Sequence, residues 1–75
     1  MNSHLQLDAK GLACPMPIVK TKKAMDTLAT GEILEVHVTD KGALADMPAW
    51  ARAGGHMILD RSEDAGVLKF YIQKA

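Results

Sequence analysis

The stretch Gly31-Glu32-Ile33-Leu34-Glu35-Val36-His37-Val38-Thr39 decides the fold of this chain. After the glycine, apolar residues alternate with a more polar set, and this period of two predicts a β-strand over residues 32–39 with one buried face. Leu34, Val36 and Val38 point to the buried side. Because the opposite face is more polar, we expect a single layer of helices on the sheet. The second face then meets solvent or another chain.

The segment before this strand predicts an amphipathic helix over residues 15 to 28 or 29, which ends before Gly31. At 3.6 residues per turn, the residues that share the core face are Ile18, Thr21, Met25, Leu28 and Ala29. Met16, Lys20 and Lys23 fall on the opposite side, with Val19 at its edge. Met16 and Val19 are therefore apolar residues placed where water or a partner meets the helix.

The rest of the chain predicts one more helix and three more strands. A helical stretch over residues 43–53 is interrupted by Pro48, so we expect its helix to start near Asp46, acting as N-cap. Residues 5–8, 56–61 and 67–73 predict strands, with a polar turn over residues 62–66. The order βαβαββ predicts an α/β (α+β) fold, a two-layer sandwich whose mixed four-stranded sheet carries two helices on one face.

Composition narrows the class of protein. Seventy-five residues suffice for one domain, residues 1–75, and few aromatics predict an aliphatic core. A formal net charge of zero argues against nucleic-acid binding by counterion release. No run is long and apolar enough for a membrane span, and no secretory signal pattern is present, so we expect no membrane partner. A single cysteine excludes an internal disulfide and favours the reducing cytoplasm.

The quartet Cys14-Pro15-Met16-Pro17 holds the chain's only cysteine just ahead of the first predicted helix. Proline is tolerated in a first helical turn, so we expect Cys14 at the N-cap, where the helix dipole favours the thiolate. Lys20, Lys22 and Lys23 follow within ten residues, and their positive charge favours the same form and an acidic partner. The competing interpretation is that the lysines simply form the solvated face of the helix and that Cys14 is a small buried apolar residue.

The chemistry open to one cysteine is limited. A dithiol oxidoreductase needs a resolving cysteine, usually three positions on, and Pro17 stands there. A single thiolate can still accept a sulfur atom as a persulfide and pass it to another thiol. His4, His37 and His56 are scattered and match no metal-ligand spacing, so we expect neither a metal nor a cofactor.

Taken together, Leu7-Asp8, the segment Gly11 to Pro17, Gly31-Glu32 and Asp46-Met47-Pro48 resemble the TusA family of sulfur carriers, also called SirA-like. The resemblance covers nearly the whole chain and implies a fold like that of the C-terminal domain of translation initiation factor three. It also implies that Cys14 carries a persulfide received from a cysteine desulfurase or a rhodanese-type donor. The acceptor would be a sulfur-relay protein such as a DsrE-like one, which makes the chain a carrier of sulfurtransferase type.

The resemblance also assigns roles to single residues. Cys14 bears the sulfur, Pro15 and Pro17 shape its loop, and Lys22 or Lys23 falls where the family often has a basic docking residue. Family members that serve tRNA thiolation typically have an acidic residue between the two prolines, and this chain has Met16. An apolar residue there implies a differently surfaced donor or acceptor. Other members serve molybdenum-cofactor assembly, sulfur oxidation or selenium metabolism.

Two alternatives stay open at this point. One is a non-enzymatic nucleic-acid-binding or regulatory module of the same fold, against which the zero net charge argues. The other is a redox switch that forms an intermolecular disulfide through Cys14.

Overall fold

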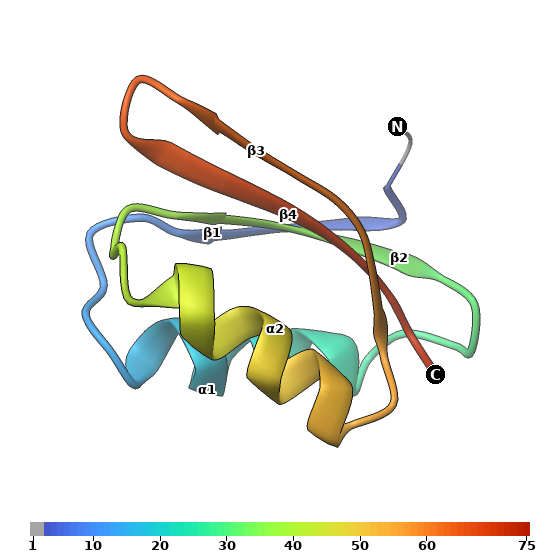
Figure 1. Cartoon of the computed structure of the whole chain (residues 1–75). Helices are drawn as coiled ribbons and strands as arrows, with labels where there is room; N and C mark the ends of the chain where they lie inside the picture. The colour runs from blue at the N-terminus through green and yellow to red at the C-terminus, as the bar shows by residue number, and fades with distance from the viewer. Residues whose placement is uncertain (1–2) are drawn as a thin grey trace.

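The structure is a computed structural model that describes residues 3–75. Within them the chain forms, in order, β1 (Leu5–Ala9), α1 (Met16–Met25), β2 (Ile33–Val38), α2 (Ala43–Ala53), β3 (Met57–Asp64) and β4 (Val67–Gln73). The strands form one sheet in the order β1-β2-β4-β3. β1 pairs parallel with β2, and the other two pairings are antiparallel. Both helices lie against the same face of this sheet (Figure 1), which confirms the predicted two-layer fold.

The core fills the space between the helices and the covered face of the sheet. Leu34 and Val36 of β2 are fully buried, as are Phe70 and Ile72 of β4, which pair with them across the sheet. The helices close the core from the other side with Pro17, Thr21 and Met25 of α1 and Ala43, Met47 and Ala51 of α2. Burying each of the larger side chains contributes about 1.5–3 kcal/mol, so the period-two strands and the helical stripe hold the layers together.

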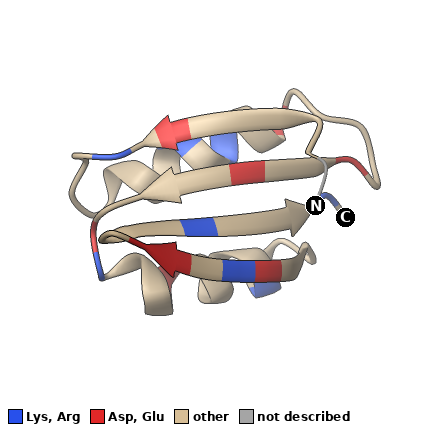
Figure 2. Cartoon of the chain, turned by 90° about the horizontal axis from the view of Figure 1, so that it is seen from above, with Lys and Arg blue, Asp and Glu red and all other residues tan. Residues whose placement is uncertain are grey.

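The other face of the sheet has no helix over it (Figure 2), yet it is not simply solvated. Glu35 on this face is only 7% exposed. Its carboxylate accepts hydrogen bonds from Ser3 Oγ at 3.1 Å and Gln6 Nε2 at 3.4 Å, and it contacts the ring of His37. The bond with His37, first among several influences, lowers the pKa of Glu35 below its ordinary value. These contacts supply the partners that a buried carboxylate needs.

Helix α1 ends at Met25, three residues earlier than its apolar pattern indicates. The N–H groups of Thr27 and Leu28 bond to carbonyls three residues back, and the Thr27 hydroxyl donates to Ala24 O at 2.6 Å. These tighter bonds close the helix. Residues 26–29 therefore leave the helix before Gly31.

Helix α2 corrects the prediction that Asp46 is its N-cap. The helix starts at Ala43 with Gly42 as N-cap, so Asp46 lies inside the first turn. Backbone N–H groups of residues 43–46 bond to carbonyls of residues 40–42 and form that turn without a side-chain cap. Pro48 lacks only the N–H that would reach the Leu44 carbonyl, a single loss near the helix start. The side chain of Asp46 is thereby left available for another contact.

Strand β3 also differs from the prediction, because Ser62, Glu63 and Asp64 belong to the strand and not to the turn. They pair with residues 67–69 of β4. The turn is only Ala65-Gly66, with φ of 52° and 81°, as a two-residue hairpin turn with two left-handed residues requires. Polarity misled the prediction because β3 is an edge strand, where side chains meet solvent.

Candidate functional site

The two connections that leave β1 and β2 meet at one edge of the sheet. Parallel strands end at the same edge, so residues 10–15 lie beside residues 39–42. The backbone N–H of Gly11 donates to Thr39 Oγ1 at 2.9 Å, and that of Cys14 donates to Asp40 Oδ2 at 2.9 Å. Asp40 also accepts from the N–H of Gly42 through its other oxygen at 3.2 Å. These bonds fix the cysteine loop against the start of α2.

Cys14 lies at this junction with an exposed side chain. Its Sγ donates a hydrogen bond to Asp46 Oδ2 at 3.2 Å, and Asp46 lies in the first turn of α2. The prediction that Cys14 is the N-cap of α1 is wrong, because Pro15 occupies that position. The peptide bond between Cys14 and Pro15 is cis. The thiol thus belongs to the residue just before the N-cap of α1 and lies between the starts of α1 and α2.

The electrostatics of the thiol correct a second expectation. The hydrogen bond to Asp46 is the largest influence that raises the pKa of Cys14 above its ordinary value, followed by desolvation and by the charges of Asp46 and Asp40. A hydrogen bond from the thiol to one carboxylate and the charges of two carboxylates close to it disfavour its anion. The surroundings of Cys14 therefore favour the thiol over the thiolate.

Four of the five residues of α1 predicted to contact a partner form a stripe along the helix. Met16 and Val19 are 42% and 37% exposed. Lys20 and Lys23 are exposed as well, and the helical period places all four on one side of α1. Lys22 lies off this stripe and pairs with Asp26 at 3.3 Å. We call Met16, Val19, Lys20 and Lys23 the α1 stripe.

The stripe starts beside the cysteine and leads away from it. Met16 is the first residue of α1, whereas Lys22 and Lys23 belong to its last turn. A ten-residue helix is about 15 Å long, so these two lysines lie at the end of α1 far from Cys14. At that distance their charges have little effect on a thiolate at Cys14. In the segment that follows Cys14, Pro15 is exposed and Pro17 is buried in the core.

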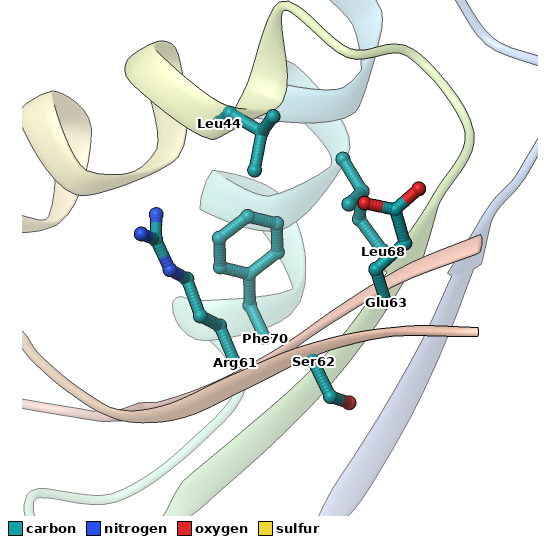
Figure 3. A pocket seen from close by; sticks show the side chains of 6 residues that line it. All are labelled: Leu44, Arg61, Ser62, Glu63, Leu68 and Phe70. Carbon is teal, nitrogen blue, oxygen red and sulfur yellow. The ribbon is translucent and has the colours of Figure 1, made fainter. Parts of the chain in front are cut away.

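A cavity of about 270 Å³ lies between α2 and the β3–β4 hairpin (Figure 3). Leu44 and Phe70 face each other across it, and Arg61 and Glu63 approach from β3. Leu44 and Asp46 are two residues apart on α2, which places them on roughly opposite sides of the helix. The cavity is therefore separate from the cysteine site.

Residues 3–75 contain neither a cluster of metal-ligating side chains nor a membrane-spanning helix. No three side chains of His, Cys, Asp or Glu in this range are grouped so as to hold a metal ion. The two helices in this range have 10 and 11 residues, which is too short to span the hydrocarbon core of a bilayer.

The fold and the exposed thiol define a small α/β sandwich that presents one cysteine at the carboxyl edge of a parallel strand pair. Comparison with known proteins identifies the family. The sequence model described as "Sulfurtransferase TusA" matches residues 5–74. The chain belongs to the TusA family, and its relatives support a role as a sulfur carrier.

Individual relatives span nearly the whole chain. This chain is 61% identical over 74 residues to YrkI of Bacillus subtilis, which is named as a candidate sulfur carrier protein. The alignment covers 99% of both chains. It is 37% identical over 70 residues to the sulfur carrier protein TusA of Allochromatium vinosum, covering 93% of this chain and 92% of the other. The crystal structure of a SirA-like protein from Desulfitobacterium hafniense superposes with a TM-score of 0.81 at 27% identity, covering 92% of this chain and 95% of that one.

Sequence reasoning missed the two carboxylates that contact Cys14. The prediction for Asp46 was a helix cap, whereas Asp46 accepts a hydrogen bond from Cys14 Sγ and Asp40 accepts one from the Cys14 backbone N–H. The signal that could have found Asp40 is its place just after β2, since residues that follow parallel neighbours share an edge. The position of Asp46 depended on where α2 starts, which Pro48 obscured.

Proposed function

We propose that this protein carries sulfur as a persulfide on Cys14. A cysteine desulfurase or a rhodanese-type protein supplies the sulfur, and a sulfur-relay protein such as a DsrE-like one accepts it. The observation that carries the proposal is the exposed thiol of the chain's only cysteine, presented at the meeting point of two loops. The family relationship supports the coarser role of sulfur carrier.

The geometry supports a direct transfer between proteins. The hydrogen bonds of Gly11 and Cys14 to residues 39 and 40 fix the backbone on either side of the loop, while the thiol stays exposed. A fixed backbone with an open side chain lets a larger active site approach the sulfur without remodelling the carrier. Because one sulfur atom is held at a time, no second cysteine is required.

The loading step balances without an added oxidant or reductant. Cys14 loses its thiol proton, and its Sγ attacks the outer sulfur of the donor's persulfide, forming a new S–S bond. The donor's own S–S bond breaks, and its inner sulfur leaves as a thiolate that takes up a proton. Delivery to the acceptor is the same exchange, with the acceptor's nucleophile attacking the outer sulfur on Cys14.

The α1 stripe is the proposed docking surface for these partners. Met16 and Val19 give it an apolar part next to Cys14, and Lys20 and Lys23 give it a positive part. Exposed apolar side chains beside charged ones are typical of protein interfaces. Met16 favours an acceptor other than the tRNA-thiolation machinery. We place the exchange in the cytoplasm, because thiol-to-thiol sulfur transfer needs partners that stay reduced.

The test is persulfide loading followed by intact mass. Incubation with a cysteine desulfurase and free cysteine should add the mass of one sulfur atom, and a thiol reductant should remove it. Cys14→Ser, which keeps a donor for Asp46, should gain nothing. A wild-type chain that never gains sulfur, or a Cys14→Ser variant that gains it equally, contradicts the proposal. RNA binding that falls with salt and persists in Cys14→Ser would favour the nucleic-acid module instead.

A further inference from the structure

Asp46 is the one side chain that touches the sulfur of Cys14 in residues 3–75 through a hydrogen bond. Its Oδ2 lies 3.2 Å from Sγ, within range for an S–H donor and a carboxylate acceptor. The contact joins residues 32 positions apart, so it exists only because α2 starts beside the cysteine loop. Asp40 binds the backbone of the same residue and completes a pair of carboxylates around it.

We propose that Asp46 controls the reactivity of Cys14 by holding its proton, and that it thereby selects sulfur donors that present a positively charged group. This inference rests on the proposed function and adds a chemical requirement to its partners. While no cation is paired with Asp46, its carboxylate holds the S–H proton of Cys14, and the weakly nucleophilic thiol predominates. A cation placed against Asp46 and Asp40 cancels their charge, weakens that hold and releases the thiolate at the moment of docking.

The charges around the thiol are consistent with this role. Asp46 approaches from α2 and Asp40 from the β2–α2 connection, and both raise the pKa of Cys14. The basic residues nearest in sequence to Cys14 and Asp40 are Lys10, Lys20 and Lys41. In the described part of the chain, none of the three makes a hydrogen bond or ion pair with Cys14, Asp40 or Asp46. The compensating cation is therefore left for the partner to supply.

The proton of Cys14 leaves before the sulfur transfer. When the partner's cation pairs with Asp46, Sγ gives up its proton to solvent, and the thiolate then attacks the outer sulfur of the donor's persulfide. The donor's inner sulfur leaves as a thiolate and takes up a proton from solvent. Asp46 thus ends each exchange as it began, and no other reactant is consumed.

The first test compares Asp46→Asn with Asp60→Asn in the alkylation of Cys14 by iodoacetamide across pH. Asparagine keeps the shape and an acceptor oxygen but removes the charge. We expect Asp46→Asn to lower the pH midpoint of alkylation and to raise the rate at neutral pH several-fold. Asp60 lies on β3, where its side chain faces away from the helices, so its variant should match the wild type. Equal midpoints in Asp46→Asn and wild type overturn the proposal.

The second test measures selectivity for charge with small disulfides. Cystamine is a dication and dithiodiglycolate a dianion, and both report thiol attack by forming a mixed disulfide. The wild type should react several-fold faster with cystamine, and this preference should shrink with added salt and in Asp46→Asn. A preference of equal size in both proteins contradicts the proposal.

Each variant must be folded for its alkylation midpoint to report on Asp46. Circular dichroism and thermal melting establish whether each variant is folded. Asp46→Glu retains the charge and should keep the high alkylation midpoint. It replaces Asp46→Asn as the test where Asp46→Asn is poorly folded. If the wild type never loads sulfur but the midpoint still shifts, the proposed function fails while the role of Asp46 stands. If the wild type loads sulfur and the midpoint does not move, the role of Asp46 alone fails.

Discussion

The carboxylate of Asp40 accepts a hydrogen bond from the backbone N–H of Cys14 at 2.9 Å, across 26 positions of the sequence. The same carboxylate binds the N–H of Gly42 at the start of α2. One side chain therefore fixes both the cysteine loop and the helix that carries Asp46. The position of the thiol relative to α2 depends on this link.

Replacing Asp40 with alanine should loosen the cysteine loop. The backbone N–H groups of Cys14 and Gly42 lose a charged acceptor. Each such bond contributes up to about 1.5–3 kcal/mol, and the loss is smaller where water takes the place of the carboxylate. We expect a loss of about 1–2 kcal/mol in unfolding free energy. Amide hydrogen exchange at Cys14 should also become faster. Glu63→Ala on β3 serves as the control, and protection of Cys14 that is equal in both variants contradicts the assignment.

Gly11 should resist substitution because of its backbone, not because of crowding. Its φ is +80°, and a Cβ added there meets nothing within 4 Å. An alanine in this left-handed region costs about 1–2 kcal/mol. Chemical denaturation should show that loss for Gly11→Ala and a smaller one for Gly11→Asn, since asparagine tolerates this region. Equal stabilities of the two variants would argue against a backbone origin.

Glu35 should make the stability of the fold depend on acid. The hydrogen bond with His37 lowers the pKa of Glu35, so the stabilising contribution is present above the ordinary glutamate value, about pH 4.3. It is lost as the pH falls through the lower folded-state value. The free energy of unfolding, measured with urea from about pH 6 to about pH 3, should therefore fall less steeply for Glu35→Gln than for wild type. Glu63→Gln, at an exposed position, should leave the slope unchanged.

The lysines of α1 should differ in their effect on partner docking. Lys20→Glu combined with Lys23→Glu reverses the charge of the α1 stripe, so the rate of sulfur uptake from the donor should fall while the melting temperature is kept. Lys22→Glu is the matched comparison, because Lys22 lies off the stripe beside Asp26. It should have the smaller effect. Transfer rates that are unchanged in the double variant would assign both lysines to a merely solvated face.

Met16 should influence which partner is preferred. Met16→Glu introduces a charge at an exposed position next to the thiol, so fold stability should change by less than about 0.5 kcal/mol. Competition between candidate acceptors for persulfide-loaded protein measures the effect. Met57→Glu, at another exposed methionine on β3, is the control. Identical distributions of sulfur among acceptors in wild type and Met16→Glu would remove Met16 from the docking surface.

Local pattern was sufficient wherever one face of an element is buried. The alternation of Leu34, Val36 and Val38 placed β2, and the spacing of Thr21 and Met25 placed the core side of α1. It failed at element ends, where backbone hydrogen bonds decide the boundary. Pro48 suggested a late start for α2, but a first turn formed by backbone bonds to residues 40–42 accommodates it.

By itself the sequence determined the layered fold, the exposure of Met16 and Val19, and the presence of one cysteine before α1, because these follow from periodicity and from covalent neighbours. Only the tertiary structure decided the state of that cysteine. Asp40 and Asp46 reach Cys14 from 26 and 32 positions away, and the hydrogen bond to Asp46, together with the charges of both carboxylates, raises the pKa of Cys14, whereas the helix dipole was expected to favour the thiolate. Charge interactions depend on distance in space, and it is the parallel pairing of β1 with β2 that sets those distances.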